Sequence, residues 1–177
     1  MFSISAPNRL IPDGSTLYTC NLQIAETAAN ANYALTVSNV SLSFPTPPGG
    51  SVPGATGGDG SVQVGAVGPT NTPVTPVGPT ETPVTPVPSG PGVAMLNVSG
   101  NAGDTVQVTA VLSVGGVTPG IAGAQNDFSF DSANLTVQGR KVCKSDPTTS
   151  CTTDPECVAA TGTAGDTCIV VPDCTVN

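Results

Sequence analysis

The chain lacks histidine and tryptophan altogether, and aromatic residues make up only 3% of its 177 residues. Without histidine, neither a Ser-His-Asp triad nor a Cys-His pair can form. Carboxylate pairs do occur, Asp127 with Asp131 and Asp154 with Glu156. Glycoside hydrolysis, however, needs two carboxyl groups across a sugar-binding cleft, and side chains that stack on sugars are scarce here. We therefore expect a protein that is not an enzyme, with no catalytic and no cofactor-binding residues.

Charged residues are also scarce, at 9% of the chain against roughly 25% in ordinary soluble proteins. Twelve acidic against four basic residues leave a net charge of −8, which argues against nucleic acid or an anionic membrane as a partner. Arg140, Lys141 and Lys144 lie close together, but the cluster is too small for a binding stripe. No apolar run is long enough to span a bilayer. Residues 1–14 lack the basic region and apolar core of a signal peptide.

The cysteines are more informative, because there are six of them and five lie between Cys143 and Cys174. Zinc is a weak alternative, since the chain has no histidine and no CxxC pair. Disulfides and an oxidising, extracellular compartment fit better. Spacing favours Cys151–Cys157 as a local loop, although other pairings stay open, and the partner of the inward-facing Cys20 would staple the Cys-rich segment to the rest. The residues expected in disulfides are Cys20, Cys143, Cys151, Cys157, Cys168 and Cys174.

Helix formers are few, whereas Val, Thr, Ser, Gly and Pro dominate, which is typical of strands joined by turns. Residues 15–25 and 104–114 alternate apolar and polar side chains, as half-buried strands do. Residues 32–43 alternate too, but their phase slips near Ser38–Asn39, which predicts a β-bulge. Residues 45–59 read as a loop. Shorter strands are expected at residues 61–67 and 93–98, around Phe128 and Phe130, and around Leu135 and Val137, giving an all-β antiparallel sandwich of jelly-roll type.

A ten-residue repeat follows the first strands: residues 68–77 read GPTNTPVTPV and residues 78–87 read GPTETPVTPV. Proline at this density excludes a helix or a central strand, so we expect polyproline-II-like extension. Threonines flanked by proline resemble O-glycosylated stalks, and an unmodified spacer is the alternative. The candidate O-glycosylation residues are Thr70, Thr72, Thr75, Thr80, Thr82 and Thr85.

Two further kinds of site are candidates. Asn39, Asn97 and Asn134 each begin an N-x-Ser/Thr triplet, which is the acceptor for N-glycosylation, although chance also produces such triplets in a Ser/Thr-rich chain. Oxygen ligands for Ca²⁺ are available in the Cys-rich segment, but their spacing matches no EF-hand loop, and solvated loop carboxylates are the alternative. These weak calcium candidates are Asp146, Asp154 and Glu156.

Two stretches of the sequence resemble a known family. GDTVQVTAVLSVGGVTPGIAGAQNDFSFDSANLTV (Gly103 to Val137) resembles the N-terminal half of a bacterial cohesin-like module: a Gly-Asp-Thr-Val strand, a Gly-containing turn, and a Phe-rich strand ending in Asp before a Leu. IPDGSTLYTCNLQIAETAANANYALTVSNVSLS (Ile11 to Ser43) resembles the C-terminal half, with an Asp-Gly turn before a long strand and a Tyr-Leu-Val strand after it. The resemblance implies a β-sandwich that holds a dockerin partner through a sheet face, and no individual residue matches that face.

The order of the halves departs from the family, because the Gly-Asp-Thr-Val half comes last here. Either the linker closes one circularly permuted sandwich within the chain, or the halves belong to successive modules of a polymer. A half-sandwich exposes unpaired strand edges and an apolar face, so each half needs a complement. Exchange with a neighbour is a head-to-tail contact that need not close. The expected divisions are residues 1–67 (C-terminal half), 68–92 (linker), 93–142 (N-terminal half) and 143–177 (Cys-rich insert).

These observations favour a structural subunit of an extracellular filament or cell-surface fibre. In this interpretation the partners are other copies of the chain, joined head to tail through complementary halves, with covalent glycans possible. The alternative is a cell-surface cohesin-like binding module whose partner is a dockerin or a glycan. The lack of tryptophan counts against a carbohydrate-binding adhesin, and the interrupted order of the halves favours the polymer.

Overall fold

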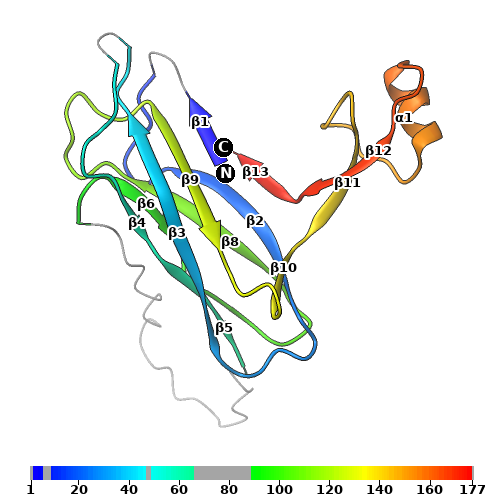
Figure 1. The fold of residues 1–177 in the computed structure, drawn as a ribbon, viewed down its shortest axis with the longest axis horizontal. Coiled ribbons are helices and arrows are strands. Elements are labelled where there is room, and N and C mark those ends of the chain that lie inside the picture. The colour runs from blue at the N-terminus through cyan, green and yellow to red at the C-terminus, as the bar shows by residue number, and fades with distance from the viewer. Residues whose placement is uncertain (1, 6–8, 47–48, 66–88, 177) are drawn as a thin grey trace, which may run out of the picture.

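The computed structural model describes residues 2–5, 9–46, 49–65 and 89–176. Of the Pro/Thr linker expected at residues 68–92, residues 68–88 therefore lie outside the described residues. Two β-sheets pack face to face, and a smaller disulfide-rich arm projects from one side of them (Figure 1). The sandwich contains β1 (Phe2–Ser5), β2 (Thr16–Ile24), β3 (Asn32–Ser43), β4 (Thr56–Gly58), β5 (Gly60–Val64), β6 (Gly92–Met95), β7 (Val98–Gly100), β8 (Thr105–Ser113), β9 (Gly123–Ser129), β10 (Leu135–Val137) and β13 (Cys174–Val176).

The two sheets have the strand orders β1-β9-β3-β5-β7 and β10-β2-β8-β6-β4. The second sheet also holds β13, which pairs with β2 beside β10. This arrangement confirms the all-β sandwich. Most ladders are antiparallel, as expected, but β4–β6 and β5–β7 are parallel. A parallel pair needs a long crossover connection, and the chain between β5 and β6 supplies it.

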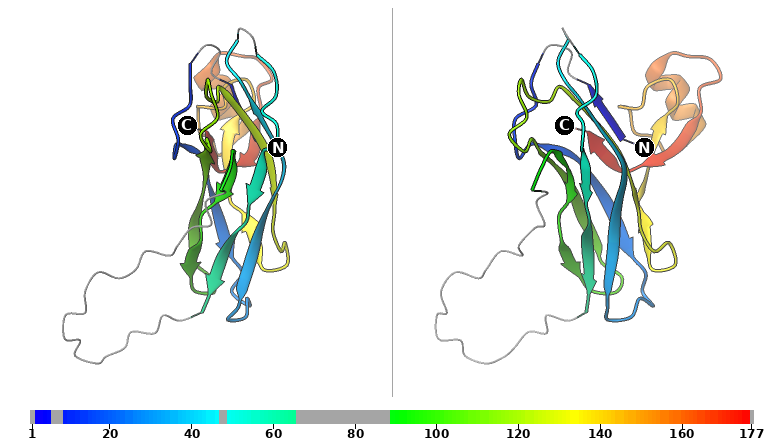
Figure 2. Two further views of the ribbon diagram at one scale, coloured as in Figure 1. Left: turned by 90° about the vertical axis from the view of Figure 1, so that its left-hand side faces the viewer. Right: turned by 60° about the vertical axis from the view of Figure 1, so that its left-hand side comes forward.

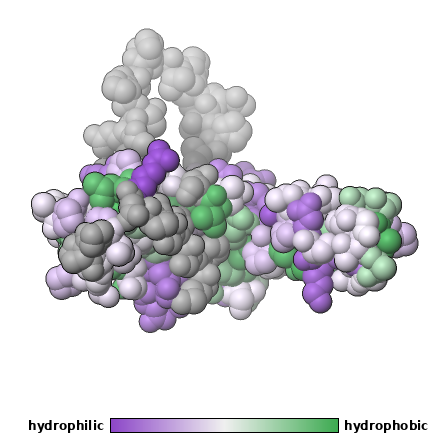
Figure 3. All heavy atoms as spheres, turned by 90° about the horizontal axis from the view of Figure 1, so that it is seen from above, coloured by the Kyte–Doolittle hydropathy of each residue, from purple (hydrophilic) through white to green (hydrophobic). Residues whose placement is uncertain are grey.

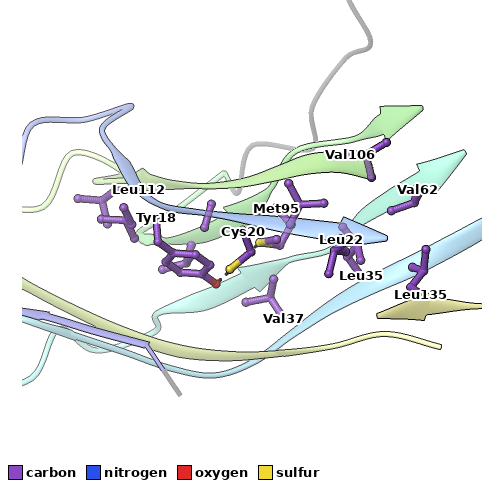
Figure 4. Close-up of a cluster of buried hydrophobic side chains, with 14 of the residues drawn as sticks. Tyr18, Cys20, Leu22, Leu35, Val37, Val62, Met95, Val106, Leu112 and Leu135 are labelled. Carbon is purple, nitrogen blue, oxygen red and sulfur yellow. Dashed lines mark hydrogen bonds between the residues drawn. The ribbon is translucent and has the colours of Figure 1, made fainter. Parts of the chain in front are cut away.

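The core lies between the sheets and is made by the inward faces of the alternating strands. Figure 4 shows Tyr18, Cys20 and Leu22 of β2 pointing toward the strands of the opposite sheet. Leu22, Leu35 and Val62 are fully buried. The strands predicted at residues 15–25, 32–43 and 104–114 correspond to β2, β3 and β8. Alternation therefore predicted both the strands and their buried faces.

The predicted phase slip in β3 is a β-bulge. The register between β3 and β9 shifts between Ser38 and Ser41, and Asn39 has φ of 50°. Asparagine tolerates this left-handed conformation better than most residues. The bulge thus lets Val37 and Leu42, which have opposite parity in the sequence, both be buried.

Some strand predictions were wrong in detail. The loop expected at residues 45–59 ends in β4, and Val52 within it is buried. The strand expected at residues 93–98 is divided between β6 and β7. Both differences have one cause: β4–β6 and β5–β7 are the parallel ladders, and β4 and β5 lie far along the chain from β6 and β7, where local patterns carry no pairing information.

The arm, residues 139–172, is built from β11 (Gly139–Cys143), α1 (Asp154–Thr161) and β12 (Cys168–Pro172). The strands β11 and β12 form a two-stranded antiparallel ribbon, and the helix lies at its far end (Figures 1 and 2). The arm begins at Gly139, ahead of the boundary expected at residue 143. The short helix was not predicted, although a capping box of Thr153 and Glu156, Pro155 in its first turn and Gly162 at its end mark it in the sequence.

Candidate functional site

The seam between the two halves of the chain runs through the whole sandwich. Residues 2–64 supply β1 to β5, and residues 92–137 supply β6 to β10. Among the described strands of the sandwich, only the β3–β5 and β6–β8 ladders join strands of the same half, whereas β2–β8, β3–β9 and β1–β9 join strands of different halves. Neither half forms a closed sandwich by itself. The halves are connected along the backbone only through residues 65–91.

A buried polar contact lies on this seam. The Asn126 side chain of β9 donates a hydrogen bond to the Tyr18 hydroxyl of β2 at 2.8 Å, and both residues are at most 2% exposed. The Tyr18 ring also stacks on Phe128, with ring centroids 6.2 Å apart. Burial raises the pKa of Tyr18, because the charged phenolate is poorly solvated in the core.

A covalent bond also crosses the seam. Cys20 of β2 and Cys174 of β13 are register partners and form a disulfide whose cysteines are 154 residues apart in the chain. The expected staple between the Cys-rich segment and the sandwich is therefore confirmed. Cys174 lies just after the arm, so this bond holds β13, the strand that follows the arm, against β2.

Hydrogen bonds at Asn21 hold the base of the arm. The chain leaves the sandwich at Gln138, whose backbone N–H donates to the Asn21 carbonyl, and returns at Asp173, whose carbonyl accepts from the Asn21 N–H. The Asp173 N–H donates to the Gln138 carbonyl, which closes a three-way junction. The Asn21 side chain also donates to the Asp173 carboxylate at 2.6 Å. The arm is thus fixed to β2 at both of its ends.

The interior of the arm is made mainly of cystines, and Val142 of β11 is also fully buried. Cys143 bonds to Cys157 and Cys151 bonds to Cys168. The arm's buried apolar cluster consists of Cys143, Cys151 and Cys157, with Cys168 packed against it. The expectation that cross-links replace a core is confirmed, and all six cysteines are paired. The Cys151–Cys157 pairing was wrong, because α1 places Cys157 against β11 instead.

Asp166 is a buried carboxylate that ties the arm's loops together, and sequence reasoning missed it. It is 6% exposed. It accepts hydrogen bonds from the Ser145 backbone and hydroxyl, the Thr161 hydroxyl and the Thr167 backbone. These donors, with Ser145 the strongest, lower the pKa of Asp166. Nothing in the spacing of Asp166 distinguishes it from a solvated carboxylate.

The three calcium candidates each have local partners. Asp146 accepts from Thr148 and Thr149, and its pKa is lowered chiefly by the Thr148 hydroxyl. Glu156 accepts from the Thr152 backbone and hydroxyl. Asp154 accepts from the Cys168 N–H at 2.7 Å. Within the described residues, none of these carboxylates belongs to a group of three or more potential metal ligands.

One group of potential metal ligands does occur in the described part of the chain. The sulfur atoms of Cys143, Cys151 and Cys157 lie within 4.8 Å of one another. All three belong to disulfides, and a disulfide sulfur has no thiolate to offer a metal. The disulfide interpretation therefore accounts for the cluster.

The outer surface of the ribbon carries cations and a valine. Arg140 and Lys141 on β11, and Lys144 just after it, are all exposed. Val170 on β12 lies opposite Lys141 and is 66% exposed, the largest value among the exposed apolar residues of the described chain. Figure 3 shows strongly hydrophilic and hydrophobic side chains together on this projecting part. The cation cluster was visible in the sequence, whereas the exposure of Val170 follows from the fold of the ribbon.

The outer face of the sheet β9-β3-β5-β7 presents uncharged polar side chains. Ser99 of β7, Gln63 of β5 and Asn32 of β3 are successive register partners across three strands, and all are exposed. A shallow hollow of about 390 Å³ lies there, lined by Asn32, Ser61, Gln63, Asn97, Val98 and Ser99. An adjoining hollow shares Asn32 and includes Tyr33 and Phe130. No charged side chain lines the first of these hollows.

The N-glycosylation candidates lie in different surroundings. Asn39 is exposed on the bulge, and its amide donates to Asp127 at 2.9 Å. Asn97 is half-buried and accepts from the Ser61 hydroxyl at 3.1 Å. Asn134 donates to Asp131 within a turn at 2.8 Å. The six O-glycosylation candidates fall outside the described residues.

The carboxylates singled out for a possible pair have structural contacts of their own. Asn39 donates to Asp127 and lowers its pKa. Asp131 accepts from Asn134 and from the Ala133 N–H, and these bonds lower its pKa as well. Both groups are thus held in the ionised form, and neither has the raised pKa of a general acid.

Comparisons with known proteins add no relative. No family model matches the chain, no curated protein matches it, and no solved structure matches its fold. Among the described residues, no helix has both the length and the apolar character needed to cross a membrane. The cohesin-like resemblance therefore stays a hypothesis that rests on the quoted motifs.

Proposed function

We propose that this chain is a structural, non-catalytic subunit of an extracellular filament or surface fibre, and that its copies are joined by completing each other's sandwiches. In such an assembly, residues 2–64 of one copy pair with residues 92–137 and the arm of the next. The alternation of the two halves in both sheets is the observation that carries this proposal.

The contacts across the seam are identical in a closed sandwich and in an exchanged one. The ladders across the seam, the core and the Tyr18–Asn126 hydrogen bond are the same whether the two halves belong to one chain or to two. Exchange therefore sacrifices no core contact and changes only which copy residues 65–91 connect. This is the condition under which exchange between identical chains is cheap. A shared core then joins subunits as firmly as it holds a domain together.

The three disulfides support the extracellular part of the proposal, because disulfides persist in oxidising compartments. They also provide its test. Cys20 lies in residues 2–64 and Cys174 follows the arm, so an exchanged assembly makes this bond intermolecular. Cys143–Cys157 and Cys151–Cys168 stay within one chain in either case.

The experiment is a denaturing gel of alkylated, unreduced native material. Strand exchange predicts a covalent ladder in steps of 17.3 kDa, which reduction collapses to the monomer. A Cys20→Ser/Cys174→Ser double variant should lose the ladder, whereas a matched Cys143→Ser/Cys157→Ser variant should keep it. A wild type that runs wholly as monomer without reduction contradicts exchange and leaves the permuted single sandwich as the correct account.

The polar face of the sheet favours a second candidate function, the binding of a neutral glycan. The amide and hydroxyl groups of Asn32, Gln63 and Ser99 lie in one row, and Tyr33 lines the adjoining hollow. Such a surface can exchange hydrogen bonds with uncharged hydroxyl groups. Calorimetric titration with a neutral polysaccharide should show binding that Asn32→Ala/Gln63→Ala abolishes. If the wild type gives no heat of binding, this candidate is excluded.

A further inference from the structure

The ribbon of the arm presents one specific exposed pair, Lys141 and Val170. They are register partners on one face of the β11–β12 ribbon. A Cβ atom on Gly139 would approach the Val170 Cγ1 atom to 2.5 Å. Residue 139 must therefore be a glycine for the Val170 side chain to lie across it. Pro172, the register partner of Gly139, is exposed on the same face. This face therefore combines one cation with a small apolar surface.

The acidic and basic side chains of the arm differ in their partners. Its carboxylates accept hydrogen bonds within the arm: Asp146 from Thr149, Asp166 from Ser145 and Glu156 from Thr152. Its cations have no such partner among the described residues, since no described carboxylate forms an ion pair with Arg140, Lys141 or Lys144. The side of the arm formed by β11 is thus electropositive, although the whole chain has a net charge of −8.

The rest of the chain has the complementary charge. Outside residues 139–172 the sequence contains eight carboxylates, and Arg9 is its only cation. Within one molecule the arm projects away from the sandwich, so its cations do not meet this acidic surface (Figures 1 and 2). The hydrogen bonds of Asn21 to Gln138 and Asp173 fix the base of the arm to β2, and two disulfides brace its interior. A second copy is the partner that presents the matching charge.

We propose that the Lys141–Val170 face of the arm docks on the acidic sandwich of a neighbouring copy. The contact rests on the proposed assembly of copies and adds to it a non-covalent interface separate from the seam. Docking removes the exposed Val170 side chain from water and brings Lys141 near carboxylates. Val170→Asp should weaken association about tenfold or more, because it loses apolar burial and adds a repelled charge.

The test uses sedimentation velocity of the full chain at low and high salt. Wild-type copies should associate, and the association should weaken as salt screens the charges. Val170→Asp and Lys141→Glu should each weaken it, whereas Lys144→Glu should not. Lys144→Glu is the matched control, because it makes the same change of charge on the arm outside the Lys141–Val170 face.

Each outcome decides the proposal. If Val170→Asp and Lys141→Glu sediment like the wild type while the covalent ladder persists on an unreduced gel, the arm contact is wrong and strand exchange stands. If no ladder forms but copies associate and Val170→Asp separates them, the arm contact stands and strand exchange is wrong.

A Lys144→Glu effect as large as that of Lys141→Glu overturns the assigned face. A wild type that is monomeric by both measurements overturns both proposals. Circular dichroism of each variant confirms that loss of association is not unfolding.

Discussion

Cys20 and Cys174 face each other across the β2–β13 ladder as register partners, and their disulfide joins the first long strand to the last one. Beside it, Asn21 bonds to Asp173 through both backbone and side chain. The strands β2 and β13 are thus joined covalently and by hydrogen bonds at the base of the arm. Several consequences of this arrangement are measurable.

Removing the seam disulfide should lower the stability of the whole molecule. The Cys20→Ser/Cys174→Ser variant lacks the disulfide that closes a loop of 154 residues. Removing such a disulfide should lower the free energy of unfolding of the protein by roughly 2–5 kcal/mol. Urea unfolding of the wild type and the double variant, followed by far-UV circular dichroism, measures the difference. A change below about 1 kcal/mol would show that the β2–β13 ladder and the Asn21 junction already hold this end.

Removing a disulfide of the arm should have a local effect instead. Cys151→Ser/Cys168→Ser takes away half of the covalent interior of the arm, which has no hydrocarbon core to replace it. Limited proteolysis should cut between residues 144 and 167 in this variant and not in the wild type. The thermal midpoint of the sandwich should change little, since this bond joins two residues within the arm. Loss of the whole fold would refute the separation of arm and sandwich.

The Asp166 carboxylate should make the arm sensitive to acid. Its pKa is lowered below the ordinary value of 3.8, chiefly by the Ser145 hydroxyl. Folding therefore favours the ionised form, so its contribution is present above pH 3.8 and is lost as pH falls through the lower folded-state pKa. Asp166→Asn should increase cleavage of the arm at pH 7, with a difference from the wild type that shrinks below pH 3.8. A difference independent of pH would contradict this account.

The Tyr18–Asn126 hydrogen bond should stabilise the seam. Tyr18→Phe keeps the ring contact with Phe128 but removes the hydroxyl that Asn126 contacts, and a lost buried hydrogen bond costs about 1–3 kcal/mol. Burial raises the pKa of Tyr18, so folding favours the neutral form and the wild type should lose stability above pH 10.0 as the unfolded chain ionises. Tyr18→Phe should show a smaller loss. Parallel unfolding curves at pH 7 and above pH 10 test both statements.

The bulge at Asn39 should depend on backbone conformation. With φ at 50°, Asn39→Gly should be nearly neutral, whereas Asn39→Val should cost about 1–2 kcal/mol because a β-branched residue is strained there. Thermal unfolding of the pair measures this difference. Equal stability of the two variants would mean that the bulge relaxes when residue 39 changes.

Much of the sandwich follows from local patterns. The alternation in residues 15–25 and 104–114 predicted β2 and β8, and the phase slip at Ser38–Asn39 predicted the bulge. These features depend on neighbours along the chain, because successive side chains of a strand face opposite sides of the sheet. The inward position of Cys20 could be inferred for the same reason, and so could its role as a staple.

Other features depend on pairs of residues that are distant in sequence. Cysteine spacing suggested Cys151–Cys157, but the fold of the arm joins Cys143 to Cys157 and Cys151 to Cys168. The parallel ladders of β4 with β6 and β5 with β7 have no local signal either. The burial of Asp166 and the exposure of Val170 likewise arise from which strands and loops come together.

The sequence by itself determined the class of this molecule: β-rich, acidic, free of histidine and held by disulfides, because composition and alternation act residue by residue. The tertiary structure alone decided how the halves interleave, which cysteines bond, and where the arm points its cations. Those properties are set by ladder register and by the packing of one sheet on the other, and both are relations between residues that no local pattern contains.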